Sequence, residues 1–152
     1  MSEIKIHPEV ASIGNYLYDL HQVDVFWQES QQGFGSKAIY VPQPTTIDSS
    51  DTLSSFKKSY NLGVKIFDET SSLAFYHADR LADEIRMKRG IIPLLGVGGS
   101  ETGDYVRIKS IEARKSEMGV AVLQITWDSR YLYERPSYIS LEEVEFKSEV
   151  RE

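Results

Sequence analysis

Hydrophobic positions recur at helical spacing near the start of the chain. Ile13 and Leu17 lie one turn apart, behind Pro8, whose fixed φ suits the first turn of a helix. This pattern predicts a helix over Pro8–His21. Gly14 costs such a helix about 1 kcal/mol relative to alanine, so we expect it to mark a close packing contact.

A second helical stripe lies near the middle of the chain, with apolar residues at every third or fourth position. Its members are Ala74, Ala78, Leu81 and Ile85. The candidate N-caps before it are Asp68, Thr70, Ser71 and Ser72. Basic residues in the last turn suit the helix dipole, and Gly90 is expected to end the helix.

Alternating apolar residues and β-branched or aromatic runs predict five strands. They span residues 23–29, 38–41, 60–67, 105–113 and 120–133. The glycine-containing segment 31–36 is predicted to join the first two strands as a hairpin. Residues 116–119 are predicted to join the last two, with Gly119 where a turn needs positive φ.

Three further segments carry no such alternation. Residues 45–55 are polar around Asp48-Ser49-Ser50-Asp51 and predict a loop long enough to be functional. The glycine-rich segment 96–103, containing Gly98 and Gly99, predicts a second loop. The end of the chain, 134–152, holds six acidic against three basic residues.

This order of elements predicts an α+β fold: a mostly antiparallel sheet of about four to five strands with two helices packed on one face. We expect one domain over residues 1–133. Residues 134–152 are expected to form an acidic C-terminal extension, which could dock on the domain itself or on a neighbouring molecule.

The composition of the chain excludes or disfavours several kinds of site and partner but does not identify a function. Seventeen Lys or Arg against 23 Asp or Glu give a formal net charge of -6, which disfavours broad binding to nucleic acid. The chain has no cysteine, which excludes disulfides and thiolate chemistry. No secretory signal is visible, and every apolar run is far shorter than the ~20 residues that span a bilayer, so we expect no membrane partner.

Candidate chemistry is sparse. Gly98–Gly103 has the glycine spacing of a phosphate loop, but Asp104 follows where that motif needs lysine. Asp79 and Asp83 lie one turn apart without a third ligand. The three histidines are scattered, and no Gly-x-Ser-x-Gly occurs. We therefore expect no catalytic, cofactor-binding or metal-binding residues, and a protein that is not an enzyme.

Aromatic residues are the remaining unusual feature: nine Tyr, six Phe and two Trp form 11% of the chain. Six of them are candidates for an aromatic stacking surface: Tyr60, Tyr105, Trp127, Tyr131, Tyr133 and Tyr138. They could stack on bases of single-stranded nucleic acid, but acidic residues interrupt the neighbouring basic ones. We favour the hydrophobic core and a subunit interface as their place.

The layout of the chain, over residues 8–133, resembles the tail terminator (tail completion) proteins of long-tailed bacteriophages. The matching features are the helix Pro8–His21, the hairpin ending in Ile39-Tyr40-Val41-Pro42, the strand 60–67, the helix with Ala78-Asp79-Arg80-Leu81-Ala82-Asp83-Glu84-Ile85, and the closing hairpin with Tyr105-Val106-Arg107-Ile108 and Leu123-Gln124-Ile125-Thr126-Trp127. The segment after Glu134 departs from the family core.

The resemblance implies a non-enzymatic virion protein that forms a ring, usually a hexamer. Such a ring caps the tail tube, stops its polymerisation and joins the tail to the head connector. Its implied partners are itself, the tail tube protein and the head–tail connector, with DNA only passing through the lumen. It implies a place at the tail–neck junction of the virion after synthesis in the cytoplasm of the host bacterium.

Interface residues are expected in three places. Asp48, Ser49, Ser50 and Asp51, together with Gly98 and Gly99, are candidates for contact with tube or connector. Tyr131, Tyr133 and Tyr138 are candidates for contact between subunits. Two alternatives stay open: another neck or tail tube subunit, and, from a different class, a nucleic-acid-binding module.

Overall fold

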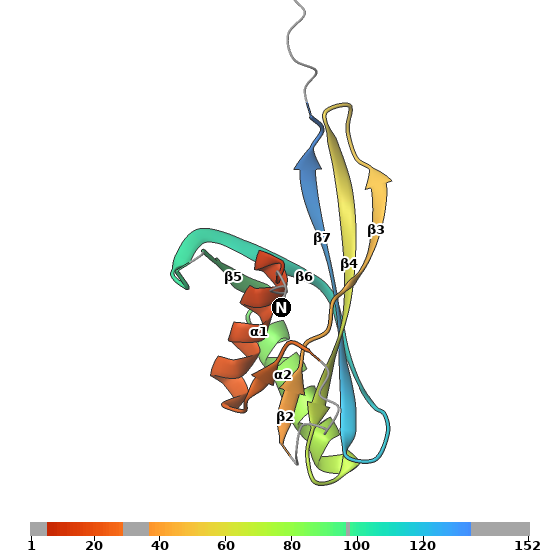
Figure 1. Ribbon diagram of the computed structural model, residues 1–152. Coiled ribbons are helices and arrows are strands. Elements are labelled where there is room, and N and C mark those ends of the chain that lie inside the picture. Colours follow the sequence, from red (N-terminus) through yellow and green to blue (C-terminus); the bar gives the residue numbers. More distant parts are fainter. Residues whose placement is uncertain (1–5, 29–36, 97, 135–152) are drawn as a thin grey trace, which may run out of the picture.

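The computed structural model describes residues 6–28, 37–96 and 98–134 and contains two helices and seven strands in that part of the chain. In chain order they are α1 (Pro8–His21), β1 (Val25–Phe26), β2 (Ala38–Tyr40), β3 (Thr45–Ser50), β4 (Ser55–Phe67), α2 (Ser71–Met87), β5 (Ile91–Leu95), β6 (Glu101–Lys115) and β7 (Val120–Leu132). Both helices lie on one side of the sheet (Figure 1). The α+β class and the helix count are thus as expected, whereas the sheet has more strands.

Both helices begin with a side-chain cap. The Nδ1 of His7 accepts the backbone N–H of Glu9 at 3.2 Å, and Pro8 occupies the first turn of α1. Of the candidate caps of the second helix, Thr70 takes this role, because its Oγ1 accepts the backbone N–H of Leu73 at 3.1 Å. Gly90 follows α2 at φ 70°, as a helix stop requires.

The sheet order is β1-β2-β4-β7-β6-β5, and β3 pairs with another part of β4. The helices form one layer and the sheet forms the other. Because side chains alternate along a strand, one face of the central strands β4, β7 and β6 points toward the helices. The residues buried between these two layers include Leu62, Val64, Ile66, Leu123, Ile125 and Trp127 from the sheet, and Ile13, Leu17, Ala78, Leu81 and Ile85 from the helices. The two apolar stripes of the sequence analysis therefore form the helix side of the core.

Two strands were missed in the sequence. β3 occupies part of the predicted loop 45–55, and all six of its residues are exposed, so no apolar alternation marks it. It forms because its backbone pairs antiparallel with β4. β5 lies where no strand was predicted, since Pro93 interrupts its apolar run; proline is tolerated there because β5 is an edge strand.

The hairpin predicted for residues 23–29 and 38–41 is wrong. β1 and β2 run parallel, with Val25 beside Ile39 and Phe26 beside Tyr40. β2 pairs antiparallel with β4. β1 follows directly after α1 and joins the sheet on the other side of β2. Residues 31–36, predicted as the turn, lie outside the described residues. The other hairpin forms as expected, with Gly119 at φ 75°.

β4 and β7 pair along their full length, from Ser55 beside Leu132 to Phe67 beside Val120. β6 accompanies β7 only as far as Trp127, after a register shift near Lys109, and then turns to pair with β5. The outer halves of β4 and β7 therefore extend beyond the helices with β3 beside them (Figure 1). Neither described helix is long and apolar enough to cross a membrane.

A polar cluster joins the end of α1 to α2. The buried carboxylate of Asp68 lies 3.2 Å from Nε2 of His77, and the rings of His77 and His21 are 4.6 Å apart between centroids. Arg80 donates to Nδ1 of His21 at 3.3 Å. Burial, followed by the nearby His77 and Arg80, lowers the pKa of His21 below its ordinary value. Two histidines far apart in sequence are thus neighbours in the fold.

Gly14 provides the first test of this packing. A Cβ at Gly14 would collide with the ring of Trp27 and lie 2.9 Å from its Cζ2, as expected for a close contact. Gly14→Ala gains about 1 kcal/mol of helix propensity, but overpacking costs ~1–3 kcal/mol. We expect a net loss of unfolding free energy in urea denaturation, with altered tryptophan fluorescence. Asn15→Ala, at an exposed position of the same helix, should be neutral or stabilising.

The pKa of His21 provides a second test. Because the folded state lowers this pKa, the unfolded chain binds the proton more readily, and stability falls as pH falls through the ordinary histidine range. Between about pH 7.5 and 5.5, His21→Gln should lose less unfolding free energy than the unmodified protein. Above that range the difference between the two proteins should be constant. Equal losses on acidification would contradict the assigned shift.

Candidate assembly surface

The most prominent surface feature is a three-stranded projection, which we call the arm. It consists of β3, residues 55–60 of β4, the turn 51–54 that joins these two strands, and residues 128–132 of β7 with Tyr133 directly after them. It rises beyond the two helices in Figure 1. Because paired residues of neighbouring strands share a face, the arm has one face on the helix side and one on the far side.

The root of the arm is bound to the first turn of α1. Tyr60 stacks on Trp127, with 5.0 Å between ring centroids and 10° between planes. Its hydroxyl lies 2.7 Å from that of Tyr131 and 3.4 Å from Nε2 of His7. Ser129 donates to the carboxylate of Glu9 at 2.5 Å. The residues that open α1 therefore also fix the direction of the arm.

The two tyrosines at this root remain protonated near neutral pH. Burial is the largest cause that raises the pKa of Tyr60, and the hydrogen bond with Tyr131 adds to it. Burial likewise raises the pKa of Tyr131, and the nearby Glu9 acts in the same direction. These hydroxyls serve as neutral hydrogen-bonding groups in the root, where Tyr131 donates to Glu9 at 3.4 Å.

Aromatic rings continue from the root toward the tip on the helix side. Phe56 stacks on Tyr131 with centroids 5.5 Å apart and contacts Tyr133 at 5.3 Å. Phe56 and Tyr133 border a shallow depression together with Asp48, Ser49 and Ser50. This series of contacting aromatic side chains thus begins at the buried Trp127 and ends at the exposed Tyr133.

The tip of the arm is an ordered turn. Asp51 accepts from Arg130 and from Ser55, each at 3.0 Å. The backbone N–H of Thr52 donates to the carbonyl of Ser55 at 3.0 Å. The side chain of Leu53, between these contacts, is fully exposed.

The interface residues predicted from the sequence fall into separate places. Asp48, Ser49, Ser50 and Asp51 lie on the same arm as Tyr131 and Tyr133, although the sequence suggested two distinct surfaces for them. Gly98 and Gly99 form the exposed turn between β5 and β6, which projects away from the arm (Figure 1). Tyr138 lies outside the described residues.

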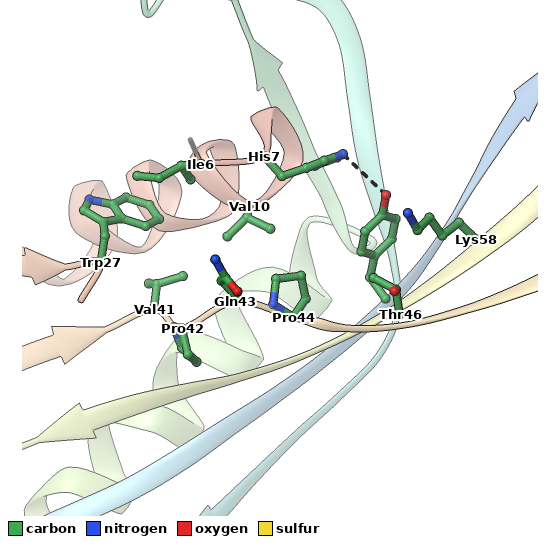
Figure 2. A pocket seen from close by; sticks show the side chains of 11 residues that line it. Ile6, His7, Val10, Trp27, Val41, Pro42, Gln43, Pro44, Thr46 and Lys58 are labelled. Carbon is green, nitrogen blue, oxygen red and sulfur yellow. Dashed lines mark hydrogen bonds between the residues drawn. The ribbon is translucent and has the colours of Figure 1, made fainter. Parts of the chain in front are cut away.

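A groove at the arm root was not anticipated. It has a volume of about 260 Å³ and is lined by Ile6, His7, Val10, Trp27, Val41, Pro42, Gln43, Pro44, Thr46, Lys58 and Tyr60. Figure 2 shows Ile6, just before α1, and Val10 of α1 on one side of the groove and the Pro42–Pro44 segment on the other, with His7 and Lys58 at one end. Its walls come from four distant parts of the chain, so no local signal in the sequence marks it.

The acidic and histidine side chains of the described residues are the candidate ligands for a metal ion. Within residues 6–28, 37–96 and 98–134, no group of three or more His, Cys, Asp or Glu side chains is arranged to hold a metal ion. Asp83 instead pairs with Arg86 at 2.9 Å. The carboxylate of Asp68 does lie 3.2 Å from Nε2 of His77, but His77 is packed against His21 at the contact between α1 and α2.

Two of the aromatic rings considered for base stacking are buried in the fold. Trp127 is fully buried and Tyr60 is 4% exposed, so neither ring can stack on a base. Lys109 pairs with Asp128 at 3.6 Å, and the guanidinium of Arg130 pairs with Asp51. Tyr105 is exposed but lies on β6, off the arm.

Comparison with known proteins places the chain among relatives. No protein-family model matches it. The chain is 42% identical over 146 residues to the uncharacterized protein YqbJ of Bacillus subtilis (strain 168), covering 96% of this chain and 100% of that protein. It is 40% identical, over the same length and coverage, to phage-like element PBSX protein XkdJ of the same organism.

Among solved structures, a chain of the virion of a native gene transfer agent particle has a TM-score of 0.44 and 12% identity, covering 77% of this chain and 84% of that one. That likeness is too distant to bear on function. The two close relatives match along almost the whole chain, so this protein belongs to the phage-associated family of YqbJ and phage-like element PBSX protein XkdJ.

Proposed function

We propose that this protein is a tail terminator: a non-enzymatic virion assembly protein whose copies form a ring, usually a hexamer. The ring caps the tail tube, stops its polymerisation and joins the tail to the head connector. In this proposal the protein is made in the host cytoplasm, resides at the tail–neck junction and needs no cofactor.

The arm is the observation that carries this proposal. It combines a rigid root with exposed aromatic rings and open backbone edges, which are features that suit binding to other protein subunits. A monomeric soluble protein has little use for such a projection, whereas a ring-forming subunit needs contact surfaces on two sides.

The relatives support the same class of function. XkdJ is named as a protein of a phage-like element, and the family match extends over nearly the whole chain. The net charge of -6 is also compatible with a lumen through which DNA passes without adhering. A different neck component or the tail tube subunit would share these features.

The oligomeric state in solution tests the proposal. We expect light scattering coupled to size-exclusion chromatography to detect a closed ring, alone or after addition of tail tube protein, and we expect the ring to halt tube growth. Long tubes formed by the isolated protein would favour a tube subunit instead. A strict monomer that binds neither tube nor connector protein would contradict the proposal.

The nucleic-acid alternative has its own measurement in the same preparation. A binding module should shift single-stranded DNA or RNA at ~50 mM salt, with affinity that falls steeply as salt rises. We expect no shift, because the net charge of -6 opposes binding to nucleic acid and two of the cations next to the arm, Lys109 and Arg130, are paired with carboxylates. A salt-sensitive shift would favour the alternative.

A further inference from the structure

The edge of the sheet outside the arm is protected against pairing with another strand. In β5, Pro93 has no backbone N–H to offer, and the register with β6 shifts between Pro93 and Leu95. The backbone N–H of Leu95 is already bound to Oγ of Ser12 on α1 at 2.9 Å. Proline, a register shift and a covering helix are the devices by which soluble proteins prevent edge-to-edge association.

The two edges of the arm lack these devices. β3 contains neither proline nor lysine between Thr45 and Ser50, and its residues are all exposed. Residues 128–132 of β7 have β4 on one side, but β6 has already left the other side at Trp127. In the described part of the chain, no strand pairs with either outer edge.

Exposed apolar side chains accompany these open edges. Ile47 on β3 is 68% exposed and Leu132 on β7 is 79% exposed. Ile47 pairs with Ser59, which pairs with Asp128, and Leu132 pairs with Ser55, so both apolar side chains are on the far side of the arm. Pairing of the two edges would place these side chains on one continuous surface.

The direction of the strands determines how such edges can meet. β3 and β7 are each antiparallel to β4, so they run parallel to each other at opposite sides of the arm. A contact between two different edges is heterologous, and when repeated by rotation it closes a ring in which no edge is left open. A contact between two β3 edges would give a two-fold dimer with both β7 edges unpaired.

We propose that β3 of one copy pairs in parallel with residues 128–132 of β7 in the next copy, so that the arms join into one continuous sheet. This inference rests on the proposed ring and identifies the surface through which the ring forms. The partner is a second copy of this chain. The backbone groups of both edges provide hydrogen bonds, and the side chains of Ile47 and Leu132 provide buried apolar area.

Cysteine crosslinking tests this contact, because the chain has no native cysteine. Ile47→Cys and Asp128→Cys, whose positions are level with each other across β4, should each give little crosslinked dimer alone, and their mixture should give it on oxidation. The double variant should give a ladder of oligomers up to the closed ring. A disulfide within one copy is excluded, since β4 separates the two strands by ~9.6 Å, beyond the ~7 Å limit between Cα atoms.

The outcomes separate this contact from the proposed function. A ring detected by light scattering in which the mixed variants do not crosslink would overturn the edge pairing alone. Efficient crosslinking of Ile47→Cys with itself would replace it by a two-fold contact. A protein that stays monomeric with and without tail tube protein would overturn both proposals.

Lysine substitution gives an independent measurement. Ile47→Lys introduces a charge into the middle of β3, where we expect it to prevent pairing and reduce the ring to monomers with unchanged circular dichroism. Met118→Lys is the matched control, because Met118 is 93% exposed in the turn between β6 and β7, away from the arm. An Ile47→Lys protein that still forms the ring would overturn the proposal.

Discussion

The antiparallel pairing of β4 with β7 is the interaction on which the rest of the structure depends. It runs without interruption from Ser55 beside Leu132 to Phe67 beside Val120. Its inner half presents Leu62, Val64, Leu123 and Ile125 to the helices and carries the core. Its outer half is longer than the helices can cover, so the same ladder that organises the core also builds the arm. The core and the proposed assembly surface therefore share one structural element.

Strand alternation connects these two halves chemically. Trp127, Tyr60, Tyr131, Phe56 and Tyr133 share the helix-side face and make contact in that order, from the buried core to the exposed tip. The first turn of α1 contacts this series through His7 and Glu9, which also begin the helix. Because the same residues start α1 and hold the arm root, the arm is joined to the core by hydrogen bonds as well as by its strands.

The candidate surface was only partly visible in the sequence. Asp48–Asp51 and the tyrosines Tyr131 and Tyr133 were expected on separate surfaces, yet β3 and β7 place them on one arm. The groove at the arm root and the contact between His21 and His77 had no local signal, because each is assembled from segments far apart along the chain. The length of the polar segment 45–55 was the available hint, since long breaker-rich segments in compact domains are often functional.

The sequence by itself determined the two helices, a short list of candidate caps for the second, the close contact at Gly14, the turn at Gly119 and the buried face of the central strands. These features follow from spacing, capping and local backbone preferences, which act over a few residues. Only the tertiary structure decided the parallel pairing of β1 with β2, the existence of β3 and β5, and the projection of the arm. The reason is that a strand's hydrogen bonds come from its neighbour. An exposed segment such as Thr45–Ser50 needs no hydrophobic pattern of its own, because β4 provides its partner groups.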